Sequence, residues 1–600
     1  MPALPHLFRR WTRLVRRLTV GRSASALLAL VATACGGGGA SAPGGGVSGR
    51  EWFVERATET GLDFVHFNGM SGEQFYPEIM APGVGVFDFD NDGDLDVYIV
   101  QGQMLGKSKT LKDAVFPPNG PQTEPPRDRL FRNDLAVATD GTRTLRFTDV
   151  TDASGIDVRT YGMGVAAADY DNDGFVDIYR TGLSGSVLLH NNGNGTFTDV
   201  TAGSGTGNRG GWSVPASFVD IDRDGWLDLY VGNYLFYTVE ADIDCLAVTG
   251  LHDYCPPNSY RPQPDVLYRN RGDGTFADVT RTALLGGADG PALGVSTADF
   301  NGDGWPDIYV GNDGMANQLW TNQQDGTFKD TAFLSGAAVN GAGNAEASMG
   351  IDAGDFDNDG DEDLFITNWL AQMNTLYVNA GGGVFEDRKA ASGLGPPSLA
   401  KTGFGTAWFD FDNDSWLDLM TANGSVSTIE AQARAKDPFP LKMRYQLYKN
   451  LGTGRFEDVS GRAGSAFALS DVGRGAAFGD LDNDGDVDVV VGTASGPARV
   501  FVNGVGNQNH WVGVRAVGAS TRRDMLGARV GIVRRDGSTL WRRVRSDGSY
   551  ASANDPRVLV GLGPSTDAVR VRVQWPNGTS EEWADVPIDG WNTLTEGQGR

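Results

Sequence analysis

Residues that commonly carry out catalysis are scarce in this 600-residue sequence, which has three Cys and five His. The histidines are His6, His66, His190, His252 and His510. No Gly-x-Ser-x-Gly stretch occurs, and the stretch from Gly102 to Ser108 is one residue short of a phosphate-binding P-loop. These absences exclude two common enzyme signatures and leave an enzyme of another class as an alternative.

Long apolar runs and an excess of positive charge are also missing. The apolar run from Ala24 to Ala34 is too short to cross a bilayer. The formal charge is −26, and loss of the six arginines before residue 35 would leave −32: Arg9, Arg10, Arg13, Arg16, Arg17 and Arg22. Nothing resembles the basic patch of a nucleic-acid-binding protein, so we expect no nucleic-acid partner.

Acidic loops are what the sequence has in abundance. A nine-residue pattern occurs seven times, with Asp or Asn at positions 1, 3, 5 and 9 and Gly or Ser at position 6. We number these copies loop 1 to loop 7. Their side chains at positions 1, 3, 5 and 9 are Asp88, Asp90, Asp92 and Asp96; Asp169, Asp171, Asp173 and Asp177; Asp220, Asp222, Asp224 and Asp228; Asp299, Asn301, Asp303 and Asp307; Asp355, Asp357, Asp359 and Asp363; Asp410, Asp412, Asp414 and Asp418; and Asp480, Asp482, Asp484 and Asp488.

This pattern predicts a cage for a hard cation in each loop. Oxygen ligands at alternate positions, a Gly at the sharp turn and a further carboxylate suit Ca2+. Backbone carbonyls at position 7 are expected to complete the cages, from Asp94, Phe175, Trp226, Trp305, Asp361, Trp416 and Asp486. We therefore predict up to seven structural Ca2+ ions. Loops 4 and 6 should bind most weakly, because Asn301 lacks a charge and Ser415 replaces Gly.

The loops are not EF-hands, which need a Glu at position 12 and a helix on each side. Position 12 is instead Ile99, Arg180, Val231, Val310, Ile366, Thr421 and Val491. The residues that follow each loop are β-branched or aromatic, as in a strand. Acidic hairpin turns without metal are the alternative, but they would leave four carboxylates together without a counter-charge.

A second repeat alternates with the loops and predicts hairpins. Its copies include Leu188–Thr201 and Leu267–Thr280, and each reads as a strand ending in Asn, a Gly-rich turn and a strand with Phe-x-Asp. One loop unit and one hairpin make a four-stranded antiparallel sheet. Seven such sheets predict an all-β, seven-bladed β-propeller.

The ends of the repeat array predict how the ring closes. The seventh unit lacks its fourth strand, and a matching strand, Trp52–Ala57, precedes loop 1. We expect this strand to complete the last blade, so that the propeller spans residues 51–506. Extra chain falls between second and third strands, around 103–127, 233–265 and 423–444. These insertions should lie on the face opposite the loops, where we expect function.

The N-terminus and the cysteines indicate export. Residues 1–34 read as a signal peptide, and Ala32–Cys35 resembles a bacterial lipobox, so we expect a lipid on Cys35 and a Gly-rich linker over 35–50. The alternative is simple signal cleavage and secretion. No Asp follows Cys35, which favours the outer membrane or cell surface. Cys245 and Cys255 are expected to form a disulfide in the second insertion.

The repeats resemble FG-GAP/VCBS repeats, as in integrin α-subunit propellers, which carry such loops and Gly-rich approaches like Gly403–Gly405. Residues 507–600 are similar to the ASPIC/UnbV module, through Asn509–Val514, Gly527–Val530, Ser546–Tyr550, Gly561–Gly563 and Val573–Gly578. The chain thus resembles bacterial relatives of cartilage acidic protein 1. Gly and Asp-Gly turns predict a small β-sandwich-like domain there. Its net charge of +3 suits either docking on the acidic ring or a solvated surface.

Two classes of function compete. The first is a calcium-stabilised, surface-anchored binding or adhesion module, a monomer that recognises a glycan or protein through the face with the insertions. The second is an extracellular enzyme or biosynthetic accessory acting on carbohydrate or a secondary metabolite. The best polar cluster on that face is His66, Asn68, Glu73, Tyr76 and Glu78. It could bind the ligand, or it could make ordinary hydrogen bonds within a loop.

Overall fold

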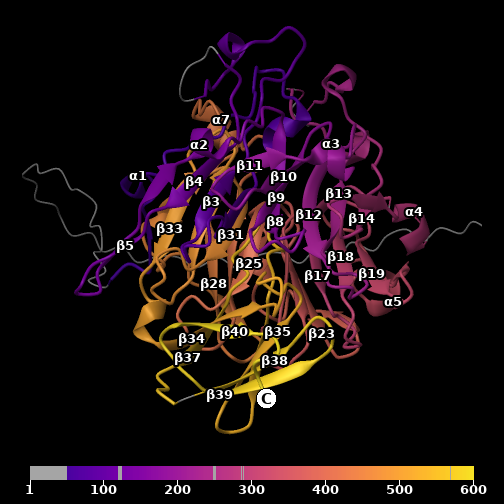
Figure 1. The fold of residues 1–600 in the computed structure, drawn as a ribbon. Helices are drawn as coiled ribbons and strands as arrows, with labels where there is room; N and C mark the ends of the chain where they lie inside the picture. Colours follow the sequence, from indigo (N-terminus) through magenta and orange to yellow (C-terminus); the bar gives the residue numbers. More distant parts are fainter. Residues whose placement is uncertain are drawn as a thin grey trace, which may run out of the picture. The chain divides into compact units, whose positions relative to one another are not determined.

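Four-stranded antiparallel sheets form the framework of the computed structural model (Figure 1). The structure describes residues 50–600 apart from 119–123, 247–249, 251, 286, 288 and 568. The predicted signal peptide, the lipid on Cys35 and nearly all of the predicted linker therefore lie outside the described residues.

Seven of the sheets in the described chain have the strand order predicted for a propeller blade, and we number them as blades 1 to 7. Their strands, from the innermost outward, are β2 (Val84–Phe87), β3 (Asp96–Ile99), β4 (Arg129–Asn133) and β7 (Phe147–Asp149); β8 (Gly162–Ala168), β9 (Asp177–Gly182), β10 (Val187–Asn191) and β11 (Phe197–Asp199); β12 (Ser213–Val219), β13 (Asp228–Asn233), β14 (Val266–Asn270) and β15 (Phe276–Asp278); β17 (Ala292–Ala298), β18 (Asp307–Asn312), β19 (Gln318–Asn322) and β20 (Phe328–Asp330); β21 (Ile351–Gly354), β22 (Asp363–Ile366), β23 (Thr375–Asn379) and β24 (Phe385–Asp387); β25 (Gly403–Phe409), β26 (Asp418–Asn423), β28 (Gln446–Asn450) and β29 (Phe456–Asp458); and β31 (Gly473–Gly479), β32 (Asp488–Thr493), β33 (Arg499–Asn503) and β1 (Phe53–Glu55).

Short elements connect these strands. The α-helices are α1 (Ala57–Thr60), α2 (Thr151–Ser154), α3 (Thr201–Ser204), α4 (Thr280–Ala283), α5 (Ala332–Ser335), α6 (Gly395–Ser398) and α7 (Glu430–Arg434). The 3-10 helices are η1 (Tyr76–Ile79), η2 (Leu111–Asp113), η3 (Val239–Ala241), η4 (Pro257–Ser259), η5 (Ala466–Ala468) and η6 (Gly506–Gln508). Minor strands are β5 (Ala136–Val137), β6 (Arg143–Thr144), β16 (Leu284–Leu285), β27 (Met443–Arg444) and β30 (Ser470–Asp471).

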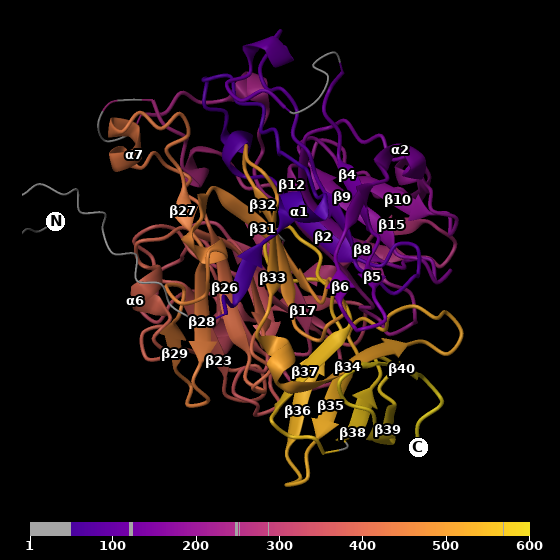
Figure 2. The same ribbon diagram turned by 90° about the vertical axis from the view of Figure 1, so that its left-hand side faces the viewer.

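The seven blades close into a ring. Each inner strand contacts the inner strand of the next blade, and β31 of blade 7 contacts β2 of blade 1. The closing strand is β1, which pairs antiparallel with β33 so that Phe53 lies opposite Asn503 (Figure 2). The prediction that the N-terminal strand completes the last blade is confirmed. Because the ring closes, the first and last blades pack against each other, and neither end of the array is left exposed.

Apolar side chains between neighbouring blades hold the ring together. Val97 and Ile99 of blade 1 belong to the same buried cluster as Val490 and Val500 of blade 7. Both faces of each middle strand meet another blade, which explains why β3 is buried at every position. This burial accounts for the β-branched and aromatic runs that follow each loop, because a strand covered on both faces needs no polar side.

A buried Asn at the end of each third strand links adjacent blades. In every case its side-chain amide donates to the backbone carbonyl at loop position 2 of the preceding blade, over 2.8 to 3.0 Å. The seven residues are Asn133, Asn191, Asn270, Asn322, Asn379, Asn450 and Asn503. The bond from Asn133 reaches Leu481 of loop 7 and so crosses the closing seam. The Asn of the hairpin repeat is therefore an inter-blade tie.

The three long insertions join second strands to third strands, as the sequence predicts. They connect β3 to β4, β13 to β14 and β26 to β28. Cys245 and Cys255 in the second insertion are bonded, with Cα atoms 5.2 Å apart. In Figure 1, α7 of the third insertion and the strands of the C-terminal module lie at opposite ends of the view.

Two sheets that share one apolar core form the C-terminal module, residues 507–600. The first contains β37 (Val558–Gly563), β34 (His510–Val517) and β40 (Trp591–Thr595), and the second contains β36 (Thr539–Arg543), β35 (Arg529–Val533), β38 (Val569–Gln574) and β39 (Ser580–Val586). Val514 and Val560 from one sheet pack with Ile532 and Val571 from the other. This all-β arrangement agrees with the predicted sandwich-like domain.

One segment of this module, residues 546–555, fills the centre of the ring, and we call it the axial segment. It bonds to a residue in each of the seven inner strands of the described blades. For example, Ile351 N–H donates to Ser549 O over 2.9 Å, and Val165 N–H donates to Ala551 O over 3.1 Å. The segment satisfies backbone groups that the inner strands leave unpaired. The C-terminal module is thus docked on the ring, and it is not a separate solvated domain.

Removing one inter-blade tie should destabilise the ring. Asn379 is 1% exposed, and its amide donates to Phe300 O over 2.9 Å. We expect Asn379→Ala to lower the free energy of unfolding by about 1 to 3 kcal/mol, because the substitution leaves a buried carbonyl unpaired. Thermal unfolding monitored by circular dichroism measures the loss. The control, Asn192→Ala, removes an exposed turn amide and should change stability by less than about 0.5 kcal/mol; equal losses in both variants would contradict the role of the tie.

Candidate functional sites

Hydrogen bonds fix the shape of each acidic loop. In all seven loops the position-1 carboxylate accepts the N–H groups of positions 5 and 6, and the position-5 carboxylate accepts the N–H of position 7. The position-9 carboxylate accepts the N–H of the tie Asn, over 2.7 to 2.8 Å. Backbone N–H groups therefore fix the carboxylates at positions 1, 5 and 9 in every loop.

Some carboxylate oxygens in the loops have no partner. One buried oxygen of the position-3 Asp makes no hydrogen bond within the described residues in loops 1, 2, 3, 5 and 6: Asp90, Asp171, Asp222, Asp357 and Asp412. Groups of three loop carboxylates have oxygens within 4.8 Å of one another, for example Asp88, Asp90 and Asp96. Oxygens gathered in this way, without donors, suit a hard cation.

Burial and mutual repulsion oppose ionisation of the loop carboxylates. Burial raises the pKa of Asp88 to about 6 and that of Asp169 to about 7. It raises the pKa of Asp228 and of Asp307 to about 8. Neighbouring carboxylates add to the effect in each loop. A charged cage therefore needs a positive partner at neutral pH.

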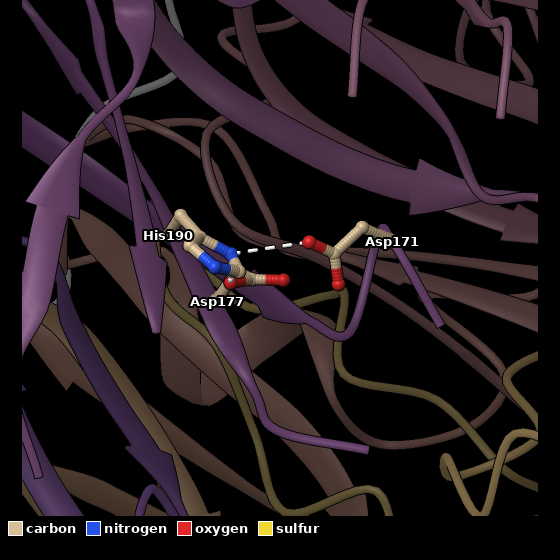
Figure 3. A group of neighbouring side chains, drawn as sticks. All are labelled: Asp171, Asp177 and His190. Atoms are coloured by element: carbon tan, nitrogen blue, oxygen red, sulfur yellow. Dashed lines mark ion pairs between the residues drawn. The ribbon is translucent and has the colours of Figure 1, made fainter. Parts of the chain in front are cut away.

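Basic side chains of the third strands lie against several loops. The His190 ring nitrogen Nδ1 is 3.1 Å from Asp171 Oδ2 and 3.2 Å from Asp177 Oδ1 (Figure 3). Lys449 Nζ contacts Asp412 and lies 3.0 Å from Asp414 in loop 6. Loop 6 also has Ser415 in the left-handed region, with φ 83°. A side chain in place of Gly and a resident ammonium distinguish this loop from the others.

Arginines of the C-terminal module contact the outer rim of the loops. Arg523 donates to Gly225 O over 3.1 Å, Arg557 to Gly93 O over 3.3 Å, and Arg542 to Ser415 O over 3.2 Å. These carbonyls all belong to loop position 6. The module thus brings positive charge to the acidic rim, which explains the opposite signs of the two parts.

A cavity of about 510 Å³ lies on the other face of the ring, among the insertions. Tyr76, Tyr260 and Phe404 line it, and so does Trp369, which is 43% exposed. The floor is continuous with the axial segment, because Tyr550 Oη donates to Met80 O over 3.0 Å and its ring packs edge-on against Phe404. The volume falls in the range of small-molecule sites.

The predicted ligand cluster divides around this cavity. Tyr76 lines it, whereas His66, Asn68 and Glu78 are buried beside it, each at most 2% exposed. Asn68 donates to Glu78 O over 3.0 Å, and Tyr254 donates to Glu78 Oε2 over 3.0 Å. The fifth residue, Glu73, is partly exposed and pairs with Lys109 Nζ at 2.6 Å.

Burial makes two of these groups unusual acids and bases. Burial, with Arg474 nearby, lowers the pKa of His66 to about 3. Burial raises the pKa of Glu78 to about 8, although the hydrogen bond from Tyr254 opposes the shift. Both side chains are therefore neutral over most of the physiological range.

Sequence reasoning missed the side chains that do face the cavity from other blades. Asp313 follows β18, Trp369 follows β22, and Tyr260 comes from the second insertion. Asp313 Oδ2 accepts from Tyr234 Oη over 2.6 Å. Single acidic or aromatic residues in the connections between strands are weak sequence signals for a binding site. Only the geometry of the ring brings Asp313, Trp369 and Tyr260 together.

Within the described residues, no helix is both long and apolar enough to cross a membrane.

Comparison with known families agrees with the repeat structure. The model of the FG-GAP-like repeat matches residues 169–231, 254–310, 299–366, 355–421 and 442–491. The model described as ASPIC and UnbV matches residues 518–600.

Known proteins show the same likeness. Human cartilage acidic protein 1 is 25% identical over 521 residues, which is 84% of this chain and 70% of the human protein. Integrin alpha-3 of Cricetulus griseus is 26% identical over 227 residues, 34% of this chain and 21% of the integrin. Among solved structures, a lectin of Agrocybe aegerita that recognises non-reducing terminal N-acetylglucosamine aligns with a TM-score of 0.34 and 17% identity, covering 63% of this chain and 79% of the lectin chain.

Replacing Glu78 tests its buried, proton-retaining state. The folded-state pKa of about 8 lies above the unfolded value near 4.5, so the stabilisation by the bound proton is complete below pH 4.5 and is lost as pH rises towards 8. Glu78→Gln lacks this pH-dependent loss. Its melting temperature relative to the parent should rise between pH 5 and pH 8.5, by the equivalent of roughly 1 to 3 kcal/mol. Scans at constant Ca2+ measure this, with the exposed Glu59→Gln as the control; a flat difference for Glu78→Gln would refute the assignment.

Proposed function

Because this chain carries FG-GAP-like repeats followed by an ASPIC and UnbV domain, we propose that it is a calcium-stabilised, exported binding module of the adhesion type. Its ligand is a glycan or a protein, and the ligand binds the face opposite the acidic loops. The observation that carries this proposal is the aromatic cavity of about 510 Å³ among the insertions. Integrin alpha-3, a partial relative, supports a role in adhesion.

Calcium has a structural role in this proposal. Each loop offers side-chain oxygens at positions 1, 3, 5 and 9, all from Asp except Asn301 in loop 4. The unpartnered position-3 oxygens in five of the loops support a cation there. The cage residues lie in the loop between two strands and, at position 9, on the first residue of the second strand, so the cage exists only in the folded blade. Binding energy released in the folded state alone adds to folding stability.

Export follows from the cysteine usage and the relatives. The bonded Cys245 and Cys255 suit an oxidising compartment. The similarity to cartilage acidic protein 1 and integrin alpha-3, which act outside cells or at their surface, supports the same location. A lipid on Cys35 would anchor the protein at the outer membrane or cell surface. We propose that the anchored protein is a monomer.

The calcium proposal predicts a large response to chelation. For residues 36–600, we expect several Ca2+ per chain by mass spectrometry and a clear fall in melting temperature with excess chelator. Asp357→Asn should remove about one Ca2+, because it weakens the cage of loop 5 at its unpartnered oxygen. The reciprocal control, Asn301→Asp, adds a carboxylate to loop 4 and should tighten binding. Little metal and no effect of chelator would overturn the proposal.

The proposed ligand cavity predicts that replacing an aromatic residue of its wall weakens ligand binding. Trp369 stands at the cavity with 43% of its surface exposed. We expect Trp369→Ala to reduce binding to any hit from a glycan or protein array by about tenfold or more. Phe333→Ala removes another exposed aromatic, 70% exposed and not part of the cavity wall, and should leave binding unchanged. Array signals that survive Trp369→Ala would place the ligand elsewhere.

A further inference from the structure

One carboxylate in the cavity has no cationic partner. Asp313 is the single charged side chain among the described residues that line the cavity. Its Oδ2 accepts a hydrogen bond from Tyr234, but no hydrogen bond or ion pair within the described chain reaches Oδ1. A carboxylate beside an apolar wall usually has a counter-charge, because desolvation of the anion is otherwise uncompensated.

Two tyrosines hold this carboxylate in place. Tyr234 Oη donates to Asp313 over 2.6 Å, so the hydrogen of Tyr76 points to Tyr234 Oη, also at 2.6 Å. Both hydroxyl dipoles are directed towards the carboxylate and favour its charged form. Burial works in the opposite direction and raises the pKa of Asp313 to about 7. The pKa of Asp313 therefore lies close to neutral pH, where a cation bound beside it would favour the charged carboxylate.

The walls around Asp313 suit a cation with an apolar body. Tyr76 and Tyr260 stack with ring centroids 5.9 Å apart, and Trp369 and Phe404 line the same space. Aromatic faces attract ammonium and guanidinium groups through their quadrupoles. Met315, two residues after Asp313 and 41% exposed, provides a flexible apolar edge of the cavity.

The second insertion, which supplies much of the cavity wall, has a net negative charge. The second insertion contains Glu240, Asp242, Asp244 and Asp253, and no Lys or Arg occurs between Tyr234 and Tyr260. The nearest buried cation, Arg474, lies behind the wall with its guanidinium 4.0 Å from the Phe404 ring centroid. It donates to four backbone carbonyls and does not line the cavity, so it makes no pair with Asp313.

We propose that this cavity binds a small organic cation, an ammonium or guanidinium group on an apolar chain or ring, with the charge paired to Asp313 Oδ1 and the body against the aromatic wall. This inference rests on the proposed ligand face and specifies its chemistry. The cation is either a free amine or the basic group at the end of a larger ligand, since both present the same chemistry to the cavity.

A charge series of probes tests the inference on the parent protein. The probes are 2-phenylethylamine, its neutral analogue 2-phenylethanol and the anion 3-phenylpropionate, with titration calorimetry and Trp fluorescence as readouts. We expect the amine to bind at least tenfold more tightly than the alcohol and the anion not to bind. Equal binding of amine and alcohol, or preference for the anion, would overturn the proposal without the need for any variant.

Two variants locate the binding charge. Asp313→Asn keeps the shape of the side chain and should weaken amine binding at least tenfold while binding of the alcohol stays unchanged. Glu430→Gln removes an exposed charge from α7, on the third insertion, and should change amine affinity less than twofold. An unchanged amine affinity in Asp313→Asn, with the fold intact by circular dichroism, would refute the assignment.

The source of the cation and the proposed function are tested separately. A lysine-containing tripeptide that competes with 2-phenylethylamine would indicate the basic end of a larger ligand, whereas competition by free amines alone would indicate a small-molecule ligand; both results support an organic cation. Amine binding that persists when arrays give no glycan or protein hit would keep this inference and reject adhesion. Array hits that bind equally well to Asp313→Asn, together with no amine binding, would keep the proposed adhesion function and reject the organic-cation site.

Discussion

Concentrated negative charge on one rim is the constraint on which this structure depends. Each of the seven loops gathers three or four carboxylates at positions 1, 3, 5 and 9, and the chain neutralises only part of that charge itself. Backbone N–H groups of the loops and of the tie Asn residues bond to the carboxylates at positions 1, 5 and 9, while position 3 keeps a free buried oxygen in five loops of the described chain. Arginines of the C-terminal module and Lys449 supply local positive charge. Under the calcium proposal, bound cations would neutralise the remainder, and charge balance would then link the loops, the docked module and the metal.

The two faces of the ring share one support. The axial segment enters from the loop side and bonds to all seven inner strands, and Tyr550 at its tip reaches Met80 and Phe404 beneath the cavity. The position of the cavity floor therefore depends on the seating of a module that lies on the opposite rim. The C-terminal module can therefore affect recognition by fixing the geometry of a cavity that it does not line.

The repeats made much of the fold predictable from the sequence. Segments that occur only once could not be placed in this way. The loop recurs seven times, and its hairpin is complete in every unit except the seventh, so a strand missing after Asn503 and present at Phe53 could be matched from sequence alone. The axial segment occurs once, and its partners are backbone groups that carry no sequence signal. The residues that line the cavity could not be predicted either, because Asp313, Trp369 and Tyr260 come from three blades. His66 and Glu78 were visible as polar residues in an apolar stretch, but the pattern did not indicate that both would be buried.

Ring closure has a consequence for how the chain is made. The strand at Phe53 pairs with a partner 450 residues later, and the axial segment arrives only after residue 546. A chain that emerges from its N-terminus can complete early blades, but it carries an open seam and an unfilled axis until synthesis is nearly finished. During that interval β2 and β31 expose sheet faces and backbone groups that would pair with any other unfinished chain. Closure of this ring is therefore a late step that requires the C-terminal part of the chain.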